Sequence, residues 1–278
     1  MALKDSDFDY IRDLIAEKTS IVLDTNKQYF VESRLGAIGD ELGLKSPAEV
    51  VLQLRKVPAS SQLHQKVTEA ITIHESSFFR HIPSLRALQD HVIPWMLWAR
   101  AGEKKLSLWC GGSFSGQDPY TILMLLYEKF PQLLLKWKLR FVATDISGKL
   151  LEKAKEGKFS QLEINRGLPA QLLSKYFVKH DLQWQVKPEI RKQIEFRQLN
   201  LVENWPPFEQ MDIIFLGNAL IYLDGPTKEK IISKARKQMR PGGFIFLGAT
   251  EMPMNVADRF ARIPLKHSEC YQTKFKLT

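Results

Sequence analysis

A glycine-rich segment in the middle of the chain has the residue types of a ligand-binding turn. Residues 106–110 are apolar enough for a buried strand, and they run into Gly111, Gly112 and Gly116 ahead of a helix expected from Pro119. Glycines at the carboxyl end of a strand let the backbone approach a ligand closely. Their spacing differs from the dinucleotide fingerprint G-x-G-x-x-G, so the turn alone does not identify the ligand.

Two acidic residues stand where they could serve the same ligand. Asp118 follows the glycines, and Asp145 ends a second apolar run, Val142-Ala143-Thr144. A carboxylate at a strand end offers two oxygens and can accept hydrogen bonds from both hydroxyls of a ribose. The combination favours a nucleoside-containing ligand. The simpler alternative is that Asp118 and Asp145 only cap the helices that follow them.

The second part of the chain alternates short apolar runs with helical patterns. Such alternation predicts a mainly parallel sheet that is covered by helices on both faces. We expect strands at residues 106–110, 140–144, 194–199, 211–216 and 244–248, and helices at 120–129, 148–156 and 228–239. Residues 157–192 interrupt the alternation with a long polar and basic stretch, which contains a possible strand at 183–187 and predicts an inserted subdomain.

The beginning of the chain has helical patterns throughout. Apolar residues between Val31 and Leu42 recur at helical spacing and end near Gly43, and Ser46-Pro47 is typical of another helix start. Ser6 and Asp9 have the spacing of a capping box, which predicts a helix beginning at Ser6. We therefore expect a small helical bundle before the sheet.

Charge divides the chain in the same place. The formal net charge is +9, but residues 1–80 hold 10 basic and 12 acidic side chains, whereas residues 81–278 hold 30 and 19. A basic surface favours acidic partners, such as nucleic acid, an anionic membrane or an acidic protein segment, although it can also be merely solvated. We predict two domains, 1–80 and 81–278, with the insertion inside the second.

Composition excludes several classes of protein. The 278 residues are 44% hydrophobic and 26% charged, typical of a globular chain, and the two cysteines cannot form a Cys-rich zinc site or a disulfide scaffold. No apolar run approaches the roughly 20 residues that cross a bilayer, and the first residues lack the apolar core of a secretory signal. We expect a cytoplasmic protein without membrane insertion.

Three segments carry a family resemblance. The run from Thr72 to Arg80 (Thr-Ile-His-Glu-Ser-Ser-Phe-Phe-Arg), the turn Ser115–Tyr120 and the Asn218–Tyr222 loop together resemble the chemotaxis receptor methyltransferases, the CheR family. The glycine turn, the acid after the second strand and the Pro-Gly-Gly turn at 241–243 also resemble class I S-adenosylmethionine-dependent methyltransferases in general. The resemblance to the CheR family runs nearly from end to end.

The resemblance implies a fold and an activity. The fold would be α/β, with a Rossmann-like class I methyltransferase sheet, an N-terminal all-helical domain that docks the receptor and a small inserted β subdomain. The activity would be methyl transfer from S-adenosylmethionine to glutamate side chains on the cytoplasmic helices of chemoreceptors, which gives glutamate methyl esters and S-adenosylhomocysteine. We expect a monomer, without a metal and without nucleic acid as a partner.

The resemblance also implies site residues. Arg80 and Tyr222 would flank the reacting methyl group. Without the resemblance, Arg80 could be an ordinary surface arginine and Tyr222 an ordinary core aromatic. A glutamate side chain, with a pKa near 4.3, is already ionised at neutral pH and needs alignment rather than a general base. The cofactor contacts would be His74, Ser76, Arg80, Gly111, Asp118, Asp145, Asn200, Leu201, Gly217 and Asn218.

Some positions depart from the family pattern and keep alternatives open. Gly217 stands where an arginine is common, which predicts weaker cofactor binding, and Asp118 stands where a glutamate is usual. These changes suit a non-catalytic descendant that binds cofactor or receptor. A nucleic-acid methyltransferase is a further alternative, but the loop at residues 218–221 lacks the two prolines expected of an enzyme that methylates base amines. The short interval 177–194 predicts no dependence on a receptor tether peptide.

Overall fold

The chain divides into two compact units, and each is described here by itself. One consists of Met1–His74 with Tyr222–Thr227, and the other of Glu75–Ile221 with Lys228–Thr278. The computed structural model describes residues 3–71, 76–207, 209–217, 219–221, 223–248, 260–265 and 268–274. None of the helices in these ranges is both long and apolar enough to cross a membrane.

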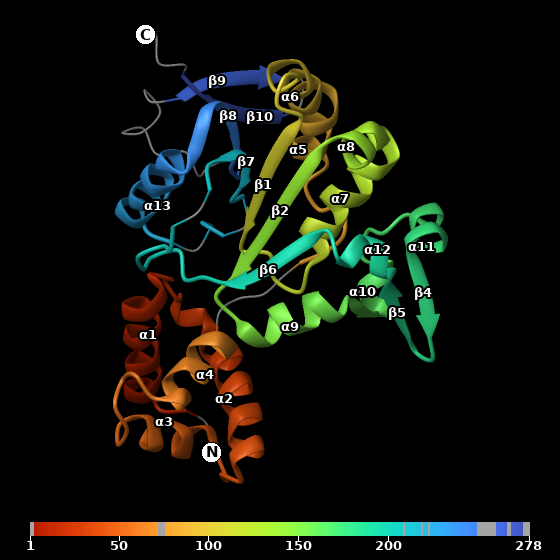
Figure 1. Cartoon of the computed structure of the whole chain (residues 1–278). Helices are drawn as coiled ribbons and strands as arrows, with labels where there is room; N and C mark the ends of the chain where they lie inside the picture. The colour runs from red at the N-terminus through yellow and green to blue at the C-terminus, as the bar shows by residue number, and fades with distance from the viewer. Residues whose placement is uncertain are drawn as a thin grey trace. The chain divides into compact units, whose positions relative to one another are not determined.

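The first unit is helical, as its patterns predict (Figure 1). Its buried residues, which include Ile11, Ile15, Leu35 and Val67, form the inner faces of the helices. An isolated bridge between Ile21 and Leu223 is the β pairing recorded for the described residues of this unit. The elements are α1 (Asp5–Thr19), the short 3-10 helix η1 (Thr25–Lys27), α2 (Gln28–Leu42), α3 (Pro47–Leu54) and α4 (Gln62–Ile71).

Two of the three expected helix boundaries in this unit are confirmed. Gly43 follows α2 with a left-handed φ of 69°, and the Ser46 hydroxyl accepts a hydrogen bond from the amide of Glu49 at the start of α3. The capping box expected at Ser6 is wrong, because α1 already begins at Asp5, one residue earlier, and has no side-chain cap. Its first turn is instead favoured by acidic side chains near the positive end of the helix dipole.

The second unit is built on a seven-stranded sheet (Figure 1). The strand order is β6-β2-β1-β7-β8-β10-β9, with β6, β2, β1, β7 and β8 parallel and β10 antiparallel to both of its neighbours. Parallel strands that are covered on both faces need apolar side chains on both sides, which explains the continuous apolar runs. The strands are β1 (Lys105–Gly111), β2 (Lys138–Asp145), β6 (Ile194–Gln198), β7 (Met211–Phe215), β8 (Met239–Phe246), β9 (Phe260–Leu265) and β10 (Ser268–Thr273).

Helices connect the strands and form much of the core. The helix expected at 120–129 begins three residues earlier, and its side chains from Pro119 to Leu126 are all buried. The helix expected at 228–239 begins three residues earlier and ends two residues earlier than expected. These helices are α5 (Ile82–Ala87), the π-helical turn η2 (Leu88–Val92), α6 (Ile93–Ala99), α7 (Gln117–Lys129), α8 (Pro131–Lys136), α9 (Gly148–Glu156) and α13 (Gly225–Lys237).

The interval between β2 and β6 contains a small antiparallel sheet of order β3-β5-β4. Figure 1 shows it with its helices beside the β6 edge of the large sheet. Phe159 and Phe177 of the small sheet are buried in the same core as the large one, so the insertion packs firmly against its host. The inserted β subdomain is confirmed; it consists of β3 (Lys158–Ser160), α10 (Gln161–Asn165), α11 (Ala170–Tyr176), β4 (Phe177–His180), β5 (Gln183–Val186) and α12 (Pro188–Arg191).

Candidate functional site

The turn after β1 lies directly against the turn after β7. Gly112 has a φ of 69°, and a Cβ atom at this position would lie 2.8 Å from the Cβ atom of Ala219. A larger residue would therefore force the two turns apart, while glycine adopts this backbone conformation without strain. The glycine-rich segment thus keeps the carboxyl ends of two adjacent parallel strands close together, which is where open α/β sheets bind their ligands.

Asp145 ties the end of β2 to this turn. Its side chain is buried, and its two oxygens accept hydrogen bonds from the amides of Phe114, at 2.9 Å, and Ser147, at 3.0 Å. The idea that Asp145 merely caps the next helix is wrong, because the side chain of Ser147 caps α9 by accepting from the amide of Leu150. Each carboxylate oxygen has two acceptor positions, so Asp145 retains capacity for ligand hydroxyls.

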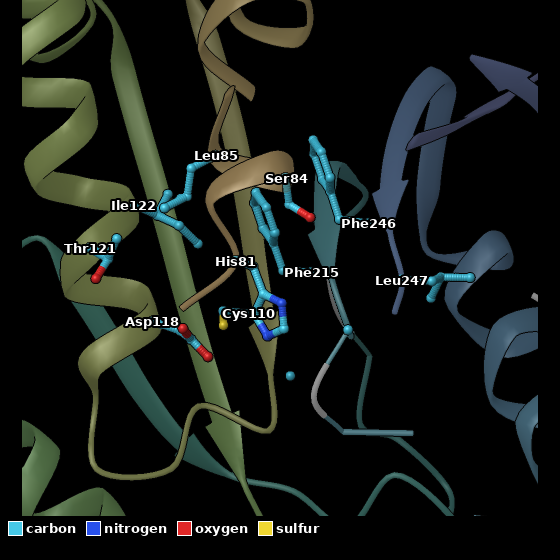
Figure 2. A pocket seen from close by; sticks show the side chains of 12 residues that line it. His81, Ser84, Leu85, Cys110, Asp118, Thr121, Ile122, Phe215, Phe246 and Leu247 are labelled. Carbon is cyan, nitrogen blue, oxygen red and sulfur yellow. The ribbon is translucent and has the colours of Figure 1, made fainter. Parts of the chain in front are cut away.

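A cavity of about 50 Å³, called here the sheet cavity, lies at the carboxyl ends of β1, β7 and β8. Its walls are mainly apolar, and burial raises the pKa of the Cys110 thiol in its lining. Figure 2 shows the lining side chains. They come from α5 and the residue before it (His81, Ser84, Leu85), β1 (Cys110, Gly111), α7 (Asp118, Thr121, Ile122), the end of β7 (Phe215, Gly217) and the end of β8 (Phe246, Leu247).

One carboxylate and one imidazole line the sheet cavity. Asp118 is not a helix cap, since α7 begins at Gln117 after Gly116; it lies within the first turn, and its side chain lines the cavity. His81 lies opposite in the lining, from the segment that leads into α5, as Figure 2 shows. Sequence reasoning missed His81, although its place directly after Arg80 was a signal that pointed to it.

The motif segment 76–80 is anchored by its two phenylalanines, on opposite sides. Phe78 is buried and packs edge to face on Phe159, with ring centroids 5.0 Å apart, in the inserted subdomain. The amide of Phe79, a residue with a φ of 52°, donates to the hydroxyl of Thr121 in α7. The segment is therefore held between the helix that lines the sheet cavity and the inserted subdomain.

A second cavity, called here the motif cavity, lies along this segment. It is open and measures about 540 Å³. Residues 76–80 form one side, and Arg166 and Gly167 of the inserted subdomain form the other. The guanidinium groups of Arg80 and Arg166 make it positively charged, and no acidic residue stands among the described residues that line it.

A lysine organises the loop after β6. Lys234 of α13 donates to the carbonyls of Leu201, at 2.7 Å, and Glu203, at 2.8 Å. Its ammonium group also lies 4.6 Å from the centre of the Trp205 ring, and the indole of Trp205 donates to the same Leu201 carbonyl at 3.0 Å. Burial lowers the pKa of Lys234. The loop that contains Asn200 and Leu201 is thus held by a residue that sequence reasoning did not single out.

The expected site residues fall into three groups. Gly111, Asp118 and Gly217 line the sheet cavity, whereas Ser76 and Arg80 line the motif cavity. Asp145, Asn200 and Leu201 lie on the carboxyl edge of β2 and β6, where the Leu199 amide donates to the Asp145 carbonyl at 2.9 Å. His74, Asn218 and Tyr222 lie outside the described residues.

These groups suit a nucleoside cofactor with an amino-acid end. Within the described residues, the buried hydroxyls of Ser76 and Ser113 have no hydrogen-bond partner, and buried hydroxyls without one are uncommon in proteins. Asp118 offers a carboxylate and His81 an imidazole to the amino-acid end of such a cofactor, and Asp145 offers acceptors to hydroxyl groups. The donor set therefore fits S-adenosylmethionine.

Comparison with known protein families identifies the family. Residues 6–72 match the model described as the CheR methyltransferase all-alpha domain, and residues 74–268 match the CheR methyltransferase SAM binding domain. The chain belongs to the CheR methyltransferase family. This result confirms the resemblance on which the sequence interpretation depended, and S-adenosylmethionine (SAM) is the cofactor of the matched domain.

Individual CheR relatives match over nearly the whole chain. Chemotaxis protein methyltransferase 1 of Pseudomonas aeruginosa and chemotaxis protein methyltransferase Cher2 of Pseudomonas putida are each 34% identical over 277 residues, which is 99% of this chain and 100% of theirs. Chemotaxis protein methyltransferase 2 of Vibrio cholerae is 32% identical over 264 residues, 94% of this chain and 90% of its own. The similarity thus includes both units rather than the methyltransferase domain alone.

Proposed function

We propose that this protein transfers a methyl group from SAM to glutamate carboxylates on the cytoplasmic helices of chemoreceptors. The observation that carries the proposal is the end-to-end similarity to proteins named chemotaxis protein methyltransferases, together with the motif at residues 76–80. A cavity with two arginines beside the cofactor cavity supports an anionic methyl acceptor. The location would be cytoplasmic, where the receptor helices are.

Residues of the sheet cavity and its edge would hold the cofactor, with Ser76 and Arg80 of the motif cavity as further contacts that the resemblance implies. Asp118 would bind the ammonium of its amino-acid end, and His81 would bind the carboxylate. Asp145 would accept hydrogen bonds from the ribose hydroxyls, and the loop with Asn200 and Leu201 would contact the adenine. When bound, SAM would supply a sulfonium methyl group to a carboxylate oxygen, with a carbon–oxygen bond forming as the carbon–sulfur bond breaks, which gives a methyl ester and S-adenosylhomocysteine as the leaving group.

Residues of the motif cavity would orient the acceptor glutamate. The acceptor carboxylate is ionised at neutral pH, so the protein needs to align it and remove part of its water rather than to take a proton from it. Arg80 would orient it through charge-assisted hydrogen bonds. Tyr222, which lies outside the described residues, would add an apolar wall and one hydrogen bond, as the resemblance implies.

The helical unit would dock the receptor. Arg34 is exposed on α2, and its guanidinium lies 5.0 Å from the centre of the Phe30 ring, so its position is restrained while its charge faces solvent. An exposed cation on a helix face favours an acidic flank of a receptor helix. We assign the receptor-docking role to the first unit as a whole. The proposed function requires no metal.

One assay tests the proposal. The protein is incubated with SAM labelled in its methyl group and with chemoreceptor-containing membranes, and alkali-labile methyl ester is measured. We expect ester on the receptor band. Label in added nucleic acid would contradict the proposal, and tight S-adenosylhomocysteine binding without transfer to any receptor would favour a non-catalytic regulatory member of the family.

A further inference from the structure

The inserted subdomain contributes a charged side chain to the motif cavity. Arg166 follows α10 and lies across this open space of about 540 Å³ from the motif segment that contains Arg80. The two arginines are 86 positions apart in the chain, so neither the motif nor its spacing indicates that they share a cavity. The folding of the insertion onto the motif brings them together.

The position of Arg166 is fixed by the backbone. Its carbonyl accepts a hydrogen bond of 3.1 Å from the amide of Phe78. The next residue, Gly167, has a φ of 94°, and a Cβ atom there would lie only 2.1 Å from the Phe78 carbonyl oxygen. Only glycine permits this contact, so the loop can pack directly on the motif.

The helix before this loop is also fixed. Ser160 and Glu163 form a complete capping box at the start of α10, and Lys153 of α9 pairs with Glu163 at 2.5 Å. The start of α10 is therefore fixed by the capping box, and the residue after its end, Arg166, is fixed against the motif by the hydrogen bond to Phe78. A side chain that is presented this firmly suits recognition better than a surface residue on a loose loop.

The charge of the cavity points to an anionic ligand. The side chain of Arg166 is exposed and makes no recorded ion pair with any described residue, and the described lining residues include no acid. Guanidinium groups bind carboxylates through two parallel hydrogen bonds.

Arg166 is left without a role, since the resemblance assigns Ser76 and Arg80, but not Arg166, to the cofactor. The amino-acid end of the cofactor is matched by Asp118 and His81 in the sheet cavity, and neither of these residues lines the motif cavity. The motif cavity is moreover open to solvent, as expected of a site that receives part of another protein. An anion from the methyl acceptor is the remaining match.

We propose that Arg166 is a substrate-binding residue, which holds an acidic side chain next to the glutamate that accepts the methyl group. Arg80 serves the reacting carboxylate and Arg166 serves its acidic neighbour, so the preferred acceptor is a helix segment with at least two carboxylates in reach. This inference rests on the proposed function and deepens it, because it names the acceptor as an acidic peptide segment rather than a single glutamate.

The test uses the full-length protein and a purified cytoplasmic fragment of a chemoreceptor with glutamate at its methylation sites. Initial rates of ester formation are measured against fragment concentration at saturating SAM. We expect Arg166→Ala to raise the KM for the fragment by roughly 10-fold to 100-fold, since a charge-assisted contact is lost, with kcat changed less than about twofold. Arg166→Lys should recover part of the loss, because lysine keeps the positive charge but cannot form the two parallel hydrogen bonds of a guanidinium group.

A matched control separates charge from position. Arg86→Ala removes the same charge from an exposed residue of α5 that lines neither cavity, and it should leave the KM unchanged. S-adenosylhomocysteine binding to the Arg166 variant, measured by calorimetry, should equal that of the unchanged protein. A receptor fragment whose flanking acid is replaced by glutamine should lower the rate of the unchanged protein but not that of Arg166→Ala.

The outcomes distinguish this inference from the proposed function. If the unchanged protein esterifies no receptor fragment, the proposed function fails and the inference fails with it. If it esterifies the fragment but Arg166→Ala behaves as Arg86→Ala does, the function stands and the inference is overturned. Equal loss of cofactor binding and acceptor binding in Arg166→Ala would also overturn it, because Arg166 would then support the fold or the cofactor.

Discussion

The two cavities of the methyltransferase unit differ in charge, in enclosure and in the way they are built. The sheet cavity is formed by strand ends and α7, is largely apolar and contains one acid and one imidazole. The motif cavity is formed by a loop and an insertion, is open and contains two guanidinium groups. We propose that this difference reflects a division of labour, in which the strand ends hold the cofactor and the insertion, packed on the motif, receives an anionic acceptor.

The strongest test of this division is the removal of Arg80. Arg80→Ala should lower kcat for receptor esterification by roughly 10²–10³-fold, which is typical for the loss of a charge that acts on the reacting groups. Binding of S-adenosylhomocysteine should weaken by about tenfold at most. Near-normal turnover in rate assays would refute the role of Arg80, and Arg86→Ala provides the comparison at equal net charge.

The next test separates the insertion from the motif. Gly167→Ala places a Cβ atom against the Phe78 carbonyl, so we expect the free energy of unfolding to fall by about 3 kcal/mol, or the loop to leave the motif and the acceptor KM to rise. Gly102→Ala is the control, since nothing lies within 4 Å of a Cβ atom there. If Gly167→Ala, like Gly102→Ala, leaves both the free energy of unfolding in urea and the acceptor KM unchanged, the packing of Gly167 on Phe78 is contradicted.

A third test addresses the zwitterion in the sheet cavity. His81→Ala should weaken S-adenosylhomocysteine binding by roughly tenfold and remove the preference for this ligand over its decarboxylated analogue. Asp118→Asn should weaken it by roughly 10-fold to 100-fold and remove the preference over the analogue without the amino group. Calorimetric titration measures the binding of S-adenosylhomocysteine and of the matching analogue to each of the two variants. An unaltered preference in either variant would show that its partner group lies elsewhere.

The smallest effect is expected at Lys234. Lys234→Met keeps the apolar stem but removes the ammonium that holds the loop at Leu201 and Glu203. We expect the KM for SAM to rise severalfold and the free energy of unfolding to fall by about 2 kcal/mol, with acceptor KM unchanged. Lys230→Met, an exposed residue of the same helix, should change none of these constants. A larger effect on acceptor KM than on cofactor KM would contradict the assignment.

Sequence reasoning succeeded where function depends on local patterns. The apolar runs of β1, β2, β6 and β7 and the glycines after β1 are local signals, and the strands and the turn lie where they were expected. The strand β8 begins at Met239, five residues earlier than expected, because residues 240–243 form an irregularity within the strand, after which pairing with β7 resumes at Phe244. The strand β10 and the edge strand β9 were missed, since β9 contains Arg262 and Pro264 and has no apolar run.

The missed site residues depend on contacts between distant segments. Arg166 reaches the motif cavity through the packing of Gly167 on Phe78, which no spacing in the sequence announces. Lys234 reaches the Leu201 loop from a helix 33 positions away. His81 alone could have been found, because it follows a recognised motif directly. Membership of a family therefore predicts the site residues that its members share, whereas the residues that folding brings into contact with them have to be found in the structure.

The division between the two cavities can be tested by one paired measurement. The dissociation constant for S-adenosylhomocysteine and the KM for the receptor fragment are determined for His81→Ala and Arg166→Ala. We predict that His81→Ala changes only the dissociation constant for the cofactor product and that Arg166→Ala changes only the KM for the acceptor. If both constants change together in either variant, the two cavities do not bind separate reactants and the account is wrong.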